Sequence, residues 1–378
     1  MGKRNNTGVY LIVLLICTVI FAMVTIYASS STKKQPSPIS AKAATLYEAE
    51  TNTFLYEKNA DQHLPMASTT KIMTALIALE NCESDDVVAI DPHAIGTEGS
   101  SAYLKMGDRL TMEELLYALL LQSANDAAVA IAYHIGGDVQ GFADMMNQKA
   151  AELGLENTSF SNPHGLDEEN HYTTARDLAL LASYALKNET FKKICSTYKK
   201  KFVTEERERT YVNHNKLLNK YSGCIGVKTG FTKKSGRCLV GAAEKDGLTF
   251  VSVTLDAPND WSDHERLFDI GFDTLEKINL AEIGEFCYKL PVIGGSAEAI
   301  TVENDECASI IVEKGTNNTI YTVKLSKFAV APIKEGDILG EVFFIQDGYT
   351  VASVKLKAAN DVEKEEKKTF FSRLFSKS

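Results

Sequence analysis

Apolar residues change their spacing along the chain, and the change separates a helix-rich segment from strand-rich ones. Apolar runs at residues 44–47 and 53–56 flank Glu50-Thr51-Asn52, where asparagine tolerates a left-handed turn, so a β-hairpin is predicted. Helices are predicted next from 3.6-residue spacing, at residues 68–79, 112–121, 126–135, 138–153 and 178–186. Capping residues support several starts, as where Thr111 and Glu114 form a capping box.

Strand-like patterns replace the helical spacing after about residue 223. Strands are expected at residues 224–229, 237–244 and 248–255, with a tight turn at residues 245–247 and a closing helix at residues 267–278. Strands from both ends of this segment enclose the helices. The pattern therefore predicts an α+β fold, in which layers of helix and sheet share one core.

Residues 286–358 consist of short strand patterns separated by Gly and Asp turns, which predicts a small all-β domain. Its strands are expected at residues 309–312, 321–325, 341–345 and 349–356.

Both ends of the chain carry apolar patterns of a different kind. Residues 9–28 form an uncharged apolar run after Lys3 and Arg4, long enough to cross a bilayer, so the chain is predicted to be exported. Both a cleaved signal peptide and a retained membrane anchor fit this run.

The C-terminal end predicts an amphipathic helix, because Phe370, Phe371, Leu374 and Phe375 recur at helical spacing among basic residues. Such a helix can lie in a membrane interface, or it can pack on the protein's own domain. The expected location is the outer face of the cytoplasmic membrane, in the cell wall space.

Five segments follow from these patterns. They are a signal peptide or anchor (1–28), a linker (29–40), the main α+β domain (41–285), the β domain (286–358) and the amphipathic tail (359–378).

Composition fits this division and excludes several classes of protein. The 378 residues correspond to about two to three domains, and 44% apolar with 24% charged residues is typical of a globular protein. A net charge of -10 argues against a nucleic-acid partner. The seven cysteines show no C-x-x-C spacing, so we expect them to be mostly reduced or buried.

The first candidate for chemistry is Ser68 with Lys71, because residues three apart on a helix share one face and a lysine there can take the serine proton. The S-x-x-K spacing also occurs at Ser30, Ser31 and Ser196, so alone it means little. Ser68 differs because it opens an apolar helix, whose free N–H groups favour negative charge on an oxygen.

Two further short motifs follow in order. Ser123-Ala124-Asn125 interrupts two helical stretches and would expose a hydroxyl and a carboxamide, although Asn125 or Asp126 could instead cap the next helix. Lys228-Thr229-Gly230 ends a predicted strand, where a glycine allows an extended peptide to approach the strand edge. A second match, Lys234-Ser235-Gly236, is expected to be a turn.

The three motifs together form the signature of penicillin-recognising serine enzymes, and the chain resembles the low-molecular-mass penicillin-binding proteins, which are serine-type D-alanyl-D-alanine carboxypeptidases. The resemblance covers residues 41–285 and implies a β-lactamase/transpeptidase-like fold, with helices on both sides of an antiparallel sheet plus a helical cluster. Further matching segments are residues 46–50, 55–59, 65–68, 162–167, 174–177 and 228–232.

This resemblance implies a penicillin-sensitive carboxypeptidase that removes the terminal D-alanine of peptidoglycan stem peptides through an acyl-enzyme, with β-lactams as covalent inhibitors. Ser68 would be the nucleophile, Lys71 would take its proton, and Ser123 would relay a proton to the leaving amine. No cofactor and no metal is implied.

The resemblance also implies how substrate is held. Asn125, Lys228, Thr229 and Gly230 would bind it, with Lys228 attracting the substrate carboxylate and keeping Lys71 poised. The oxyanion would be held by the N–H groups of Ser68 and Phe231.

Two departures and two alternatives accompany this interpretation. The match of residues 331–340 to the family's second domain is loose, and an arginine expected before the closing helix is missing from residues 259–264.

A class A β-lactamase would need a deacylating carboxylate, for which Glu152 and Glu156 are weak candidates. A non-catalytic sensor of stem peptides is the other alternative. His164 fits a turn residue better than a metal ligand or a base.

Overall fold

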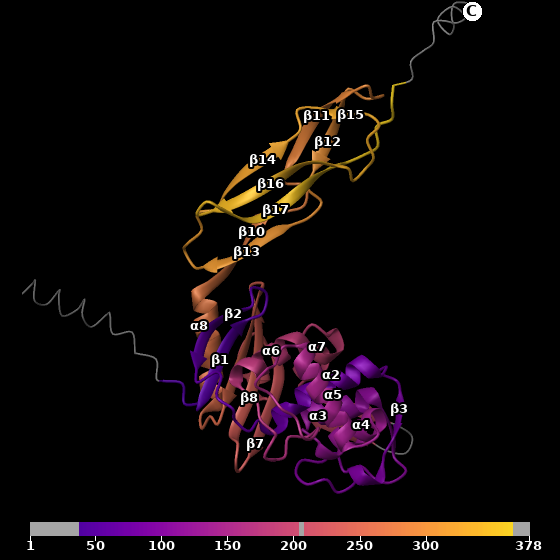
Figure 1. Cartoon of the computed structure of the whole chain (residues 1–378), viewed down its shortest axis with the longest axis vertical. Helices are drawn as coiled ribbons and strands as arrows, with labels where there is room; N and C mark the ends of the chain where they lie inside the picture. Colours follow the sequence, from indigo (N-terminus) through magenta and orange to yellow (C-terminus); the bar gives the residue numbers. More distant parts are fainter. Residues whose placement is uncertain (1–37, 204–207, 366–378) are drawn as a thin grey trace, which may run out of the picture. The chain divides into compact units, whose positions relative to one another are not determined.

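The computed structural model describes residues 38–203 and 208–365 (Figure 1). The apolar run at residues 9–28, which includes Cys17, and the aromatic residues of the tail lie outside these ranges. Within them, no helix is both long and apolar enough to cross a membrane.

An antiparallel sheet of five strands forms the centre of the main domain, in the order β2-β1-β9-β8-β7 (Figure 1). Its strands are β1 (Ala43–Glu48), β2 (Thr53–Lys58), β7 (Cys224–Thr232), β8 (Gly236–Lys245) and β9 (Leu248–Leu255). The predicted first hairpin is confirmed, and Asn52 takes the left-handed conformation expected of it, with φ of 56°.

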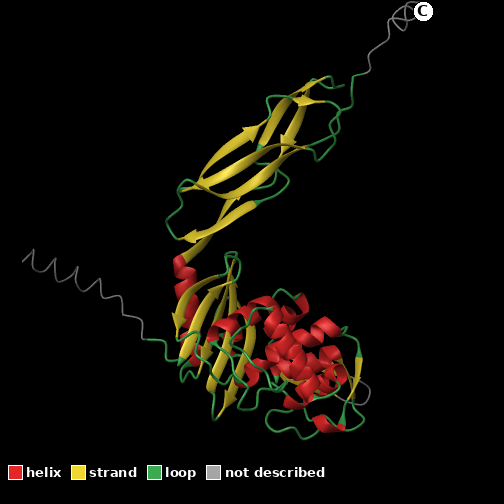
Figure 2. Ribbon diagram, viewed as in Figure 1, coloured by secondary structure: helices red, strands yellow, loops and turns green. Residues whose placement is uncertain are grey.

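Alternate residues of β9 face different layers. Val251, Val253 and Leu255 belong to the core shared with the helical cluster. Ser252 and Thr254 instead bond to His264 of α8 (Asp260–Thr274), which covers the opposite face of the sheet. The predicted α+β layering, with helices on both sides of the sheet, is confirmed (Figure 2).

The helical cluster is built around helices that are apolar nearly all round, as expected of buried helices. Its helices are α2 (Lys71–Asn81), α3 (Met112–Leu121), α4 (Asn125–Gly136), α5 (Val139–Glu152), α6 (Ala175–Ala185) and α7 (Glu189–Ser196). Thr111 caps α3 by accepting the Glu114 N–H at 3.2 Å, as the sequence predicts.

Shorter elements connect these layers. They are the 3-10 turns η1 (Ala67–Thr70), η2 (Pro92–Ala94) and η3 (Lys216–Asn219), and the strand pairs β3 (Val87–Ala89) with β4 (Arg109–Thr111) and β5 (Lys199–Val203) with β6 (Glu208–Val212).

Two predicted helices have different bounds in the structure. The segment predicted as one helix from residue 68 begins with η1, and the α-helix starts only at Lys71. The closing helix predicted at residues 267–278 starts earlier, at Asp260, and ends at Thr274, after which β10 (Leu275–Ala281) begins. β10 pairs with β13, and this strand pairing overrides the helical periodicity that continues to Ile278.

The predicted small all-β domain is present and has its own apolar core, which includes Leu290, Val342 and Leu356. Six strands form one sheet in the order β14-β16-β17-β12-β11-β15, and β10 and β13 form a second pair. The strands after β10 are β11 (Cys287–Ile293), β12 (Ala299–Glu303), β13 (Ala308–Glu313), β14 (Ile320–Leu325), β15 (Ala329–Val330), β16 (Ile338–Gln346) and β17 (Tyr349–Ala358).

The cysteines of the described segments are all free thiols. Cys195 and Cys238 are buried, whereas Cys287 and Cys307 are exposed on the β domain.

Candidate active site

Ser68 lies in the 3-10 turn that leads into α2, and it is half-buried. Because Ser68 and Lys71 are three residues apart, the turn brings the Lys71 amine to 2.9 Å from the serine Oγ. A neighbouring loop packs directly against this turn at Gly165. A Cβ on Gly165 would stand 2.0 Å from the Ala67 carbonyl oxygen, and its φ of 91° also favours glycine.

Lys71 is fully buried and meets three oxygen atoms. Its Nζ lies 2.9 Å from Ser68 Oγ, 2.7 Å from Asn125 Oδ1 and 2.5 Å from the His164 carbonyl oxygen. Burial and the nearby charge of Lys228 hold the pKa of Lys71 well below its usual value, while Asp126 opposes the shift. An amine with a lowered pKa can be neutral at physiological pH and so can accept a proton from Ser68.

Ser123 stands at the break between α3 and α4 with φ of 61°. A left-handed conformation costs a non-glycine residue roughly 1–2 kcal/mol, and such strain is concentrated at functional sites. The Lys228 amine donates to Ser123 Oγ at 3.0 Å and to the Thr229 carbonyl oxygen at 2.8 Å. Burial lowers the pKa of Lys228 to about 7, so this lysine can exchange a proton near neutral pH.

Asn125 is the first residue of α4, but its side chain does not cap the helix. Its Oδ1 accepts from Lys71, and its Nδ2 donates to the Glu98 carbonyl oxygen at 2.5 Å. Asp126 bonds instead to the loop before α3, through Ser101 Oγ at 2.6 Å and the Ala102 N–H at 2.9 Å. Neither residue is the N-cap of α4, which is Ala124, although Asp126 Oδ1 also accepts the Ala127 N–H at 2.9 Å in the first turn.

Lys228, Thr229 and Gly230 lie on β7, which is the edge strand of the sheet. A Cβ on Gly230 would stand 2.9 Å from the Ser68 nitrogen, so glycine lets the strand run directly against the backbone of the serine turn. The next residue, Phe231, is 66% exposed. The second motif match, at residues 234–236, forms the predicted turn, in which Ser235 Oγ accepts the Thr232 N–H at 3.0 Å.

A cavity of about 720 Å³ opens where these elements meet. Ser68, Ser123, Thr229, Gly230 and Phe231 all line it, whereas Lys71, Lys228 and Asn125 lie buried behind its wall. The other lining residues are Ser100, Tyr198, Asn213, His214, Lys216, Asn219, Lys220, Arg237, Asp260 and Trp261. The structure thus brings all the predicted site residues to one place.

His164 has the turn role expected of it. Its Nδ1 accepts the Leu166 N–H at 3.2 Å, and burial together with Lys71 lowers its pKa to about 3, so the ring is neutral.

Sequence reasoning missed several residues that support or line the site. The buried ring of His171 lies 2.8 Å from Thr70 Oγ1, next to the serine turn, and accepts the Ser161 N–H at 3.0 Å. Asp126 anchors the loop at residues 101–104. Arg237 lines the cavity, as does the exposed Lys220. No local motif marks these positions. The only signals in the sequence are that Asp126 directly follows the S-x-N motif and that His171 lies ten residues after Ser161.

Sequence profiles of two families match the chain. That of D-alanyl-D-alanine carboxypeptidase matches residues 29–259, and that of the penicillin-binding protein 5 C-terminal domain matches residues 275–364. The D-alanyl-D-alanine carboxypeptidase DacF of Bacillus subtilis is 35% identical over 345 residues, which cover 88% of each chain.

Solved structures agree with the sequence comparisons. Penicillin-binding protein 5 of Haemophilus influenzae aligns with a TM-score of 0.63 and 29% identity, over 87% of this chain and 99% of that one. The peptidoglycan synthesis regulatory factor PBP3 of Streptococcus pneumoniae aligns with a TM-score of 0.68 and 27% identity, over 86% of this chain and 100% of that one.

Proposed function

This chain belongs to the D-alanyl-D-alanine carboxypeptidase family, and from that premise we propose that Ser68 is the nucleophile of a penicillin-sensitive serine hydrolase. The enzyme removes the terminal D-alanine from peptides ending in D-Ala-D-Ala, as peptidoglycan stem peptides do. The observation that carries the residue assignment is the 2.9 Å contact between Ser68 Oγ and the buried Lys71 amine.

In the acylation step, neutral Lys71 takes the proton of Ser68 Oγ as that oxygen attacks the carbonyl carbon between the two D-alanines. The N–H groups of Ser68 and Phe231 hold the oxyanion, an assignment supported by the approach of β7 to the Ser68 nitrogen at Gly230. Ser123 passes its proton to the leaving nitrogen and takes one from the charged Lys228 amine that donates to it, so D-alanine departs with a neutral amine and an acyl-enzyme remains. At this stage Lys71 keeps the proton taken from Ser68. Water then hydrolyses the ester.

Substrate binding uses the edge of β7. An extended peptide can add to an exposed strand edge, and Gly230 keeps that edge close to the nucleophile. In this proposal Asn125 bonds the peptide backbone of the substrate by exchanging its bond with Lys71 or with the Glu98 carbonyl oxygen, and Thr229 bonds the terminal carboxylate. Both residues lie around the cavity, Asn125 behind its wall and Thr229 in its lining.

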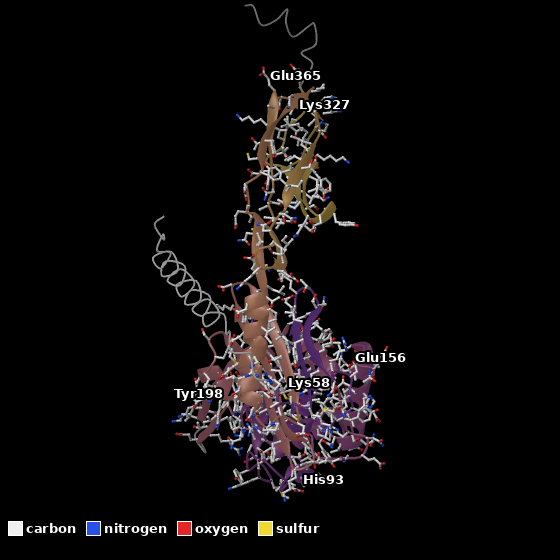
Figure 3. The ribbon with its side chains drawn as sticks, turned by 90° about the vertical axis from the view of Figure 1, so that its left-hand side faces the viewer. Lys58, His93, Glu156, Tyr198, Lys327 and Glu365 are labelled. Carbon is white, nitrogen blue, oxygen red and sulfur yellow. The ribbon has the colours of Figure 1, made fainter. Side chains whose placement is uncertain are left out.

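β-Lactams acylate the same serine in this proposal, and their slow release distinguishes the enzyme from a β-lactamase. The two glutamates considered for rapid deacylation do not line the cavity. Glu152 pairs with Lys149 at 2.7 Å, and Glu156 lies on the opposite side of the domain from the cavity residue Tyr198 (Figure 3).

The proposal is tested with the protein lacking residues 1–28. We expect it to release D-alanine from a peptide ending in D-Ala-D-Ala and to retain a labelled penicillin for many minutes, and we expect Ser68→Ala to lose both properties while keeping its melting temperature. Rapid turnover of penicillin would favour a β-lactamase. Covalent labelling without peptide cleavage would favour a sensor of stem peptides.

We also propose that the exported protein attaches to the outer face of the cytoplasmic membrane through its C-terminal tail. The apolar face predicted for Phe370, Phe371, Leu374 and Phe375 supports this attachment. The apolar run at residues 9–28 supports export.

The end of the β domain gives additional support. Glu365, the last described residue, donates its N–H to the Gly294 carbonyl oxygen at 2.9 Å, and it lies near Lys327 at one end of this domain (Figure 3). Ile293 and Val330 on the paired strands β11 and β15, together with Phe328, are 51%, 62% and 50% exposed. Exposed apolar side chains therefore lie on and beside the strand β11, which ends next to the bonding partner of the last described residue.

The division of the chain is also a proposal. We place the end of the peptidase domain at the end of α8 and the start of the β domain at β10, because β10 pairs with β13. The segment between residues 275 and 285 then belongs to the β domain.

A further inference from the structure

The cavity lined by Ser68 has an arginine in its wall that no motif predicted. Arg237 lines it, together with Asp260 and Trp261 at the start of α8. This is the segment in which the sequence lacks the arginine expected from the family and has an acidic residue instead.

The sheet register places Arg237 beside the substrate-binding strand. Arg237 on β8 stands opposite Phe231 on β7, and Leu239 stands opposite Thr229. Because side chains alternate along a strand, Thr229 and Arg237 lie on the same face as a diagonal pair, about 7–8 Å apart at their Cα atoms, within reach of a long side chain.

Asp260 fixes one side of the guanidinium. Its buried carboxylate accepts from Arg237 Nη2 at 2.8 Å and from the Trp261 N–H at 2.9 Å. The guanidinium carbon lies 5.6 Å from the centre of the Trp261 ring. Contacts with the protein itself therefore orient the arginine before any substrate binds, and 43% of its side chain remains exposed.

The guanidinium has donors to spare. Arginine carries five N–H donors, and its Nε is buried without a hydrogen-bond partner in the described parts of the chain. Because Asp260 bonds only Nη2 and 43% of the side chain is exposed, a carboxylate arriving beside Thr229 could accept from the remaining exposed donors of the fork.

We propose that Arg237, positioned by Asp260, binds the terminal carboxylate of the substrate together with Thr229. This inference rests on the proposed function, because a D-Ala-D-Ala peptide ends in a free carboxylate one residue beyond the bond that is cleaved. Arg237 is thus a residue that determines specificity for a free C-terminus, and Asp260 is a positioning residue.

Other cations line the same cavity but fit the carboxylate less well. Lys216 and Lys220 lie on and after η3, are exposed, and carry a point charge without a planar fork. Lys220 therefore offers a matched control, because Lys220→Gln removes one positive charge from the cavity without touching the pair formed by Arg237 and Asp260.

The test compares two substrates, a blocked tripeptide ending in D-Ala-D-Ala and the same peptide with a C-terminal amide. We expect Arg237→Gln to lower kcat/KM on the free acid about 10- to 100-fold, as loss of a charged hydrogen bond does, and to leave the amide within about threefold of wild type. Arg237→Lys should recover part of the loss, and Asp260→Asn should cause a smaller loss of the same selectivity.

Lys220→Gln should leave the ratio of the two substrates unchanged. Equal losses on acid and amide in Arg237→Gln, no loss on the acid, or an acid-selective loss in Lys220→Gln would each overturn the assignment. If Arg237→Gln does not fold, Arg237→Lys and Asp260→Asn supply the same comparison. Failure of the wild-type protein to release D-alanine would contradict the proposed function itself, which is a separate result.

Discussion

Two buried lysines in one site are unusual, because lysine is almost never fully buried without a partner. The amines of Lys71 and Lys228 donate hydrogen bonds to oxygen atoms of the protein. Burial therefore costs these groups no hydrogen bonds, and its effect is seen in their pKa values. Burial lowers both pKa values, and the charge of Lys228 lowers that of Lys71 further. The charge of Lys228 therefore favours the neutral form of Lys71, and a neutral Lys71 can accept the proton of Ser68.

Replacing Lys228 with methionine should move the pH dependence of acylation. The charge of Lys228 is one cause of the lowered pKa of Lys71, so removing it raises the pKa of Lys71. Since only neutral Lys71 accepts a proton, the acid limb of the rate profile shifts to higher pH, and the rate falls about 10²- to 10⁴-fold with loss of the proton relay. The measurement is the rate of labelling by a fluorescent penicillin between pH 5 and pH 10.

Lys220→Gln is the control for this experiment, because its exposed charge is screened by solvent and should leave the profile in place. An acid limb in Lys228→Met that coincides with the wild-type limb would contradict electrostatic coupling between the two lysines.

At the residue scale, the sequence predicted those groups whose chemistry lies in short motifs. Ser68 and Lys71 could be paired because three residues on one turn fix their separation, and Thr229 and Gly230 could be placed at a strand edge. Arg237 could not be found in this way. Its role depends on a cross-strand register and on a helix start far along the chain, neither of which leaves a local pattern.

At the scale of elements, α8 is held to the sheet by a fully buried polar contact at His264. The ring of His264 lies 2.5 Å from Ser252 Oγ and 2.9 Å from Thr254 Oγ1, both on β9. Gly241 on β8 makes room for the ring, since a Cβ there would stand 2.6 Å from His264 Nδ1. Complete burial lowers the pKa of His264 to about 3, so the ring is neutral in the folded protein.

His264 should make the protein sensitive to acid. The unfolded chain binds a proton at this ring near pH 6.5 and the folded protein only near pH 3, so stability is full above pH 6.5 and is lost as pH falls between these values. The loss from this one group is about 1.4 kcal/mol per pH unit. His264→Gln should be less stable than wild type at pH 7 by about 1–3 kcal/mol, through its lost hydrogen bonds, but should lose stability less steeply below pH 6.

Urea unfolding of both proteins at pH 7, 6, 5 and 4 measures the two slopes. His93→Gln is a matched control, because His93 is 70% exposed at its side chain and contributes no such burial. Equal slopes in wild type and His264→Gln would show that the buried ring does not set the acid sensitivity.

Element boundaries were predicted less well than element types, for a physical reason visible in two places. Leu275 and Ile278 continue the apolar spacing of α8, yet they pair with Glu313 and Ile310 of β13, and a partner strand distant in sequence decides their conformation. The turn at Ala67–Thr70 is 3-10 rather than α, with Ala67 at φ of 47° before Ser68. Contacts with the Gly165 loop and with β7 hold that turn, and the sequence of the helix alone does not contain them.

At the scale of the whole molecule, every cavity residue within the described parts of the chain lies between Ser68 and Trp261. The described residues of the β domain therefore contribute no group to the lining of this cavity, and along the chain this domain joins the peptidase domain to the tail. Length and apolar patterning predicted both domains because each has its own core, with Leu116 in one and Val342 in the other. Patterning does not say what the exposed apolar residues at the end of the β domain contact.

Removing the tail should separate membrane binding from catalysis. We compare the protein lacking residues 1–28 with one that also lacks residues 366–378, by sedimentation with vesicles of neutral lipid and of 30% anionic lipid. Burial of one phenylalanine side chain is worth about 1.5–3 kcal/mol, so the shorter protein should bind vesicles at least about 10-fold more weakly, and Phe371→Ser should cause a large part of that loss. Arg373→Gln should weaken binding to anionic vesicles only.

Release of D-alanine in solution should be the same in all four proteins, because no residue of the tail is needed for the site at Ser68. If the protein without residues 366–378 still binds vesicles, the β domain rather than the tail binds the membrane. Phe328→Ser is then the next variant to measure.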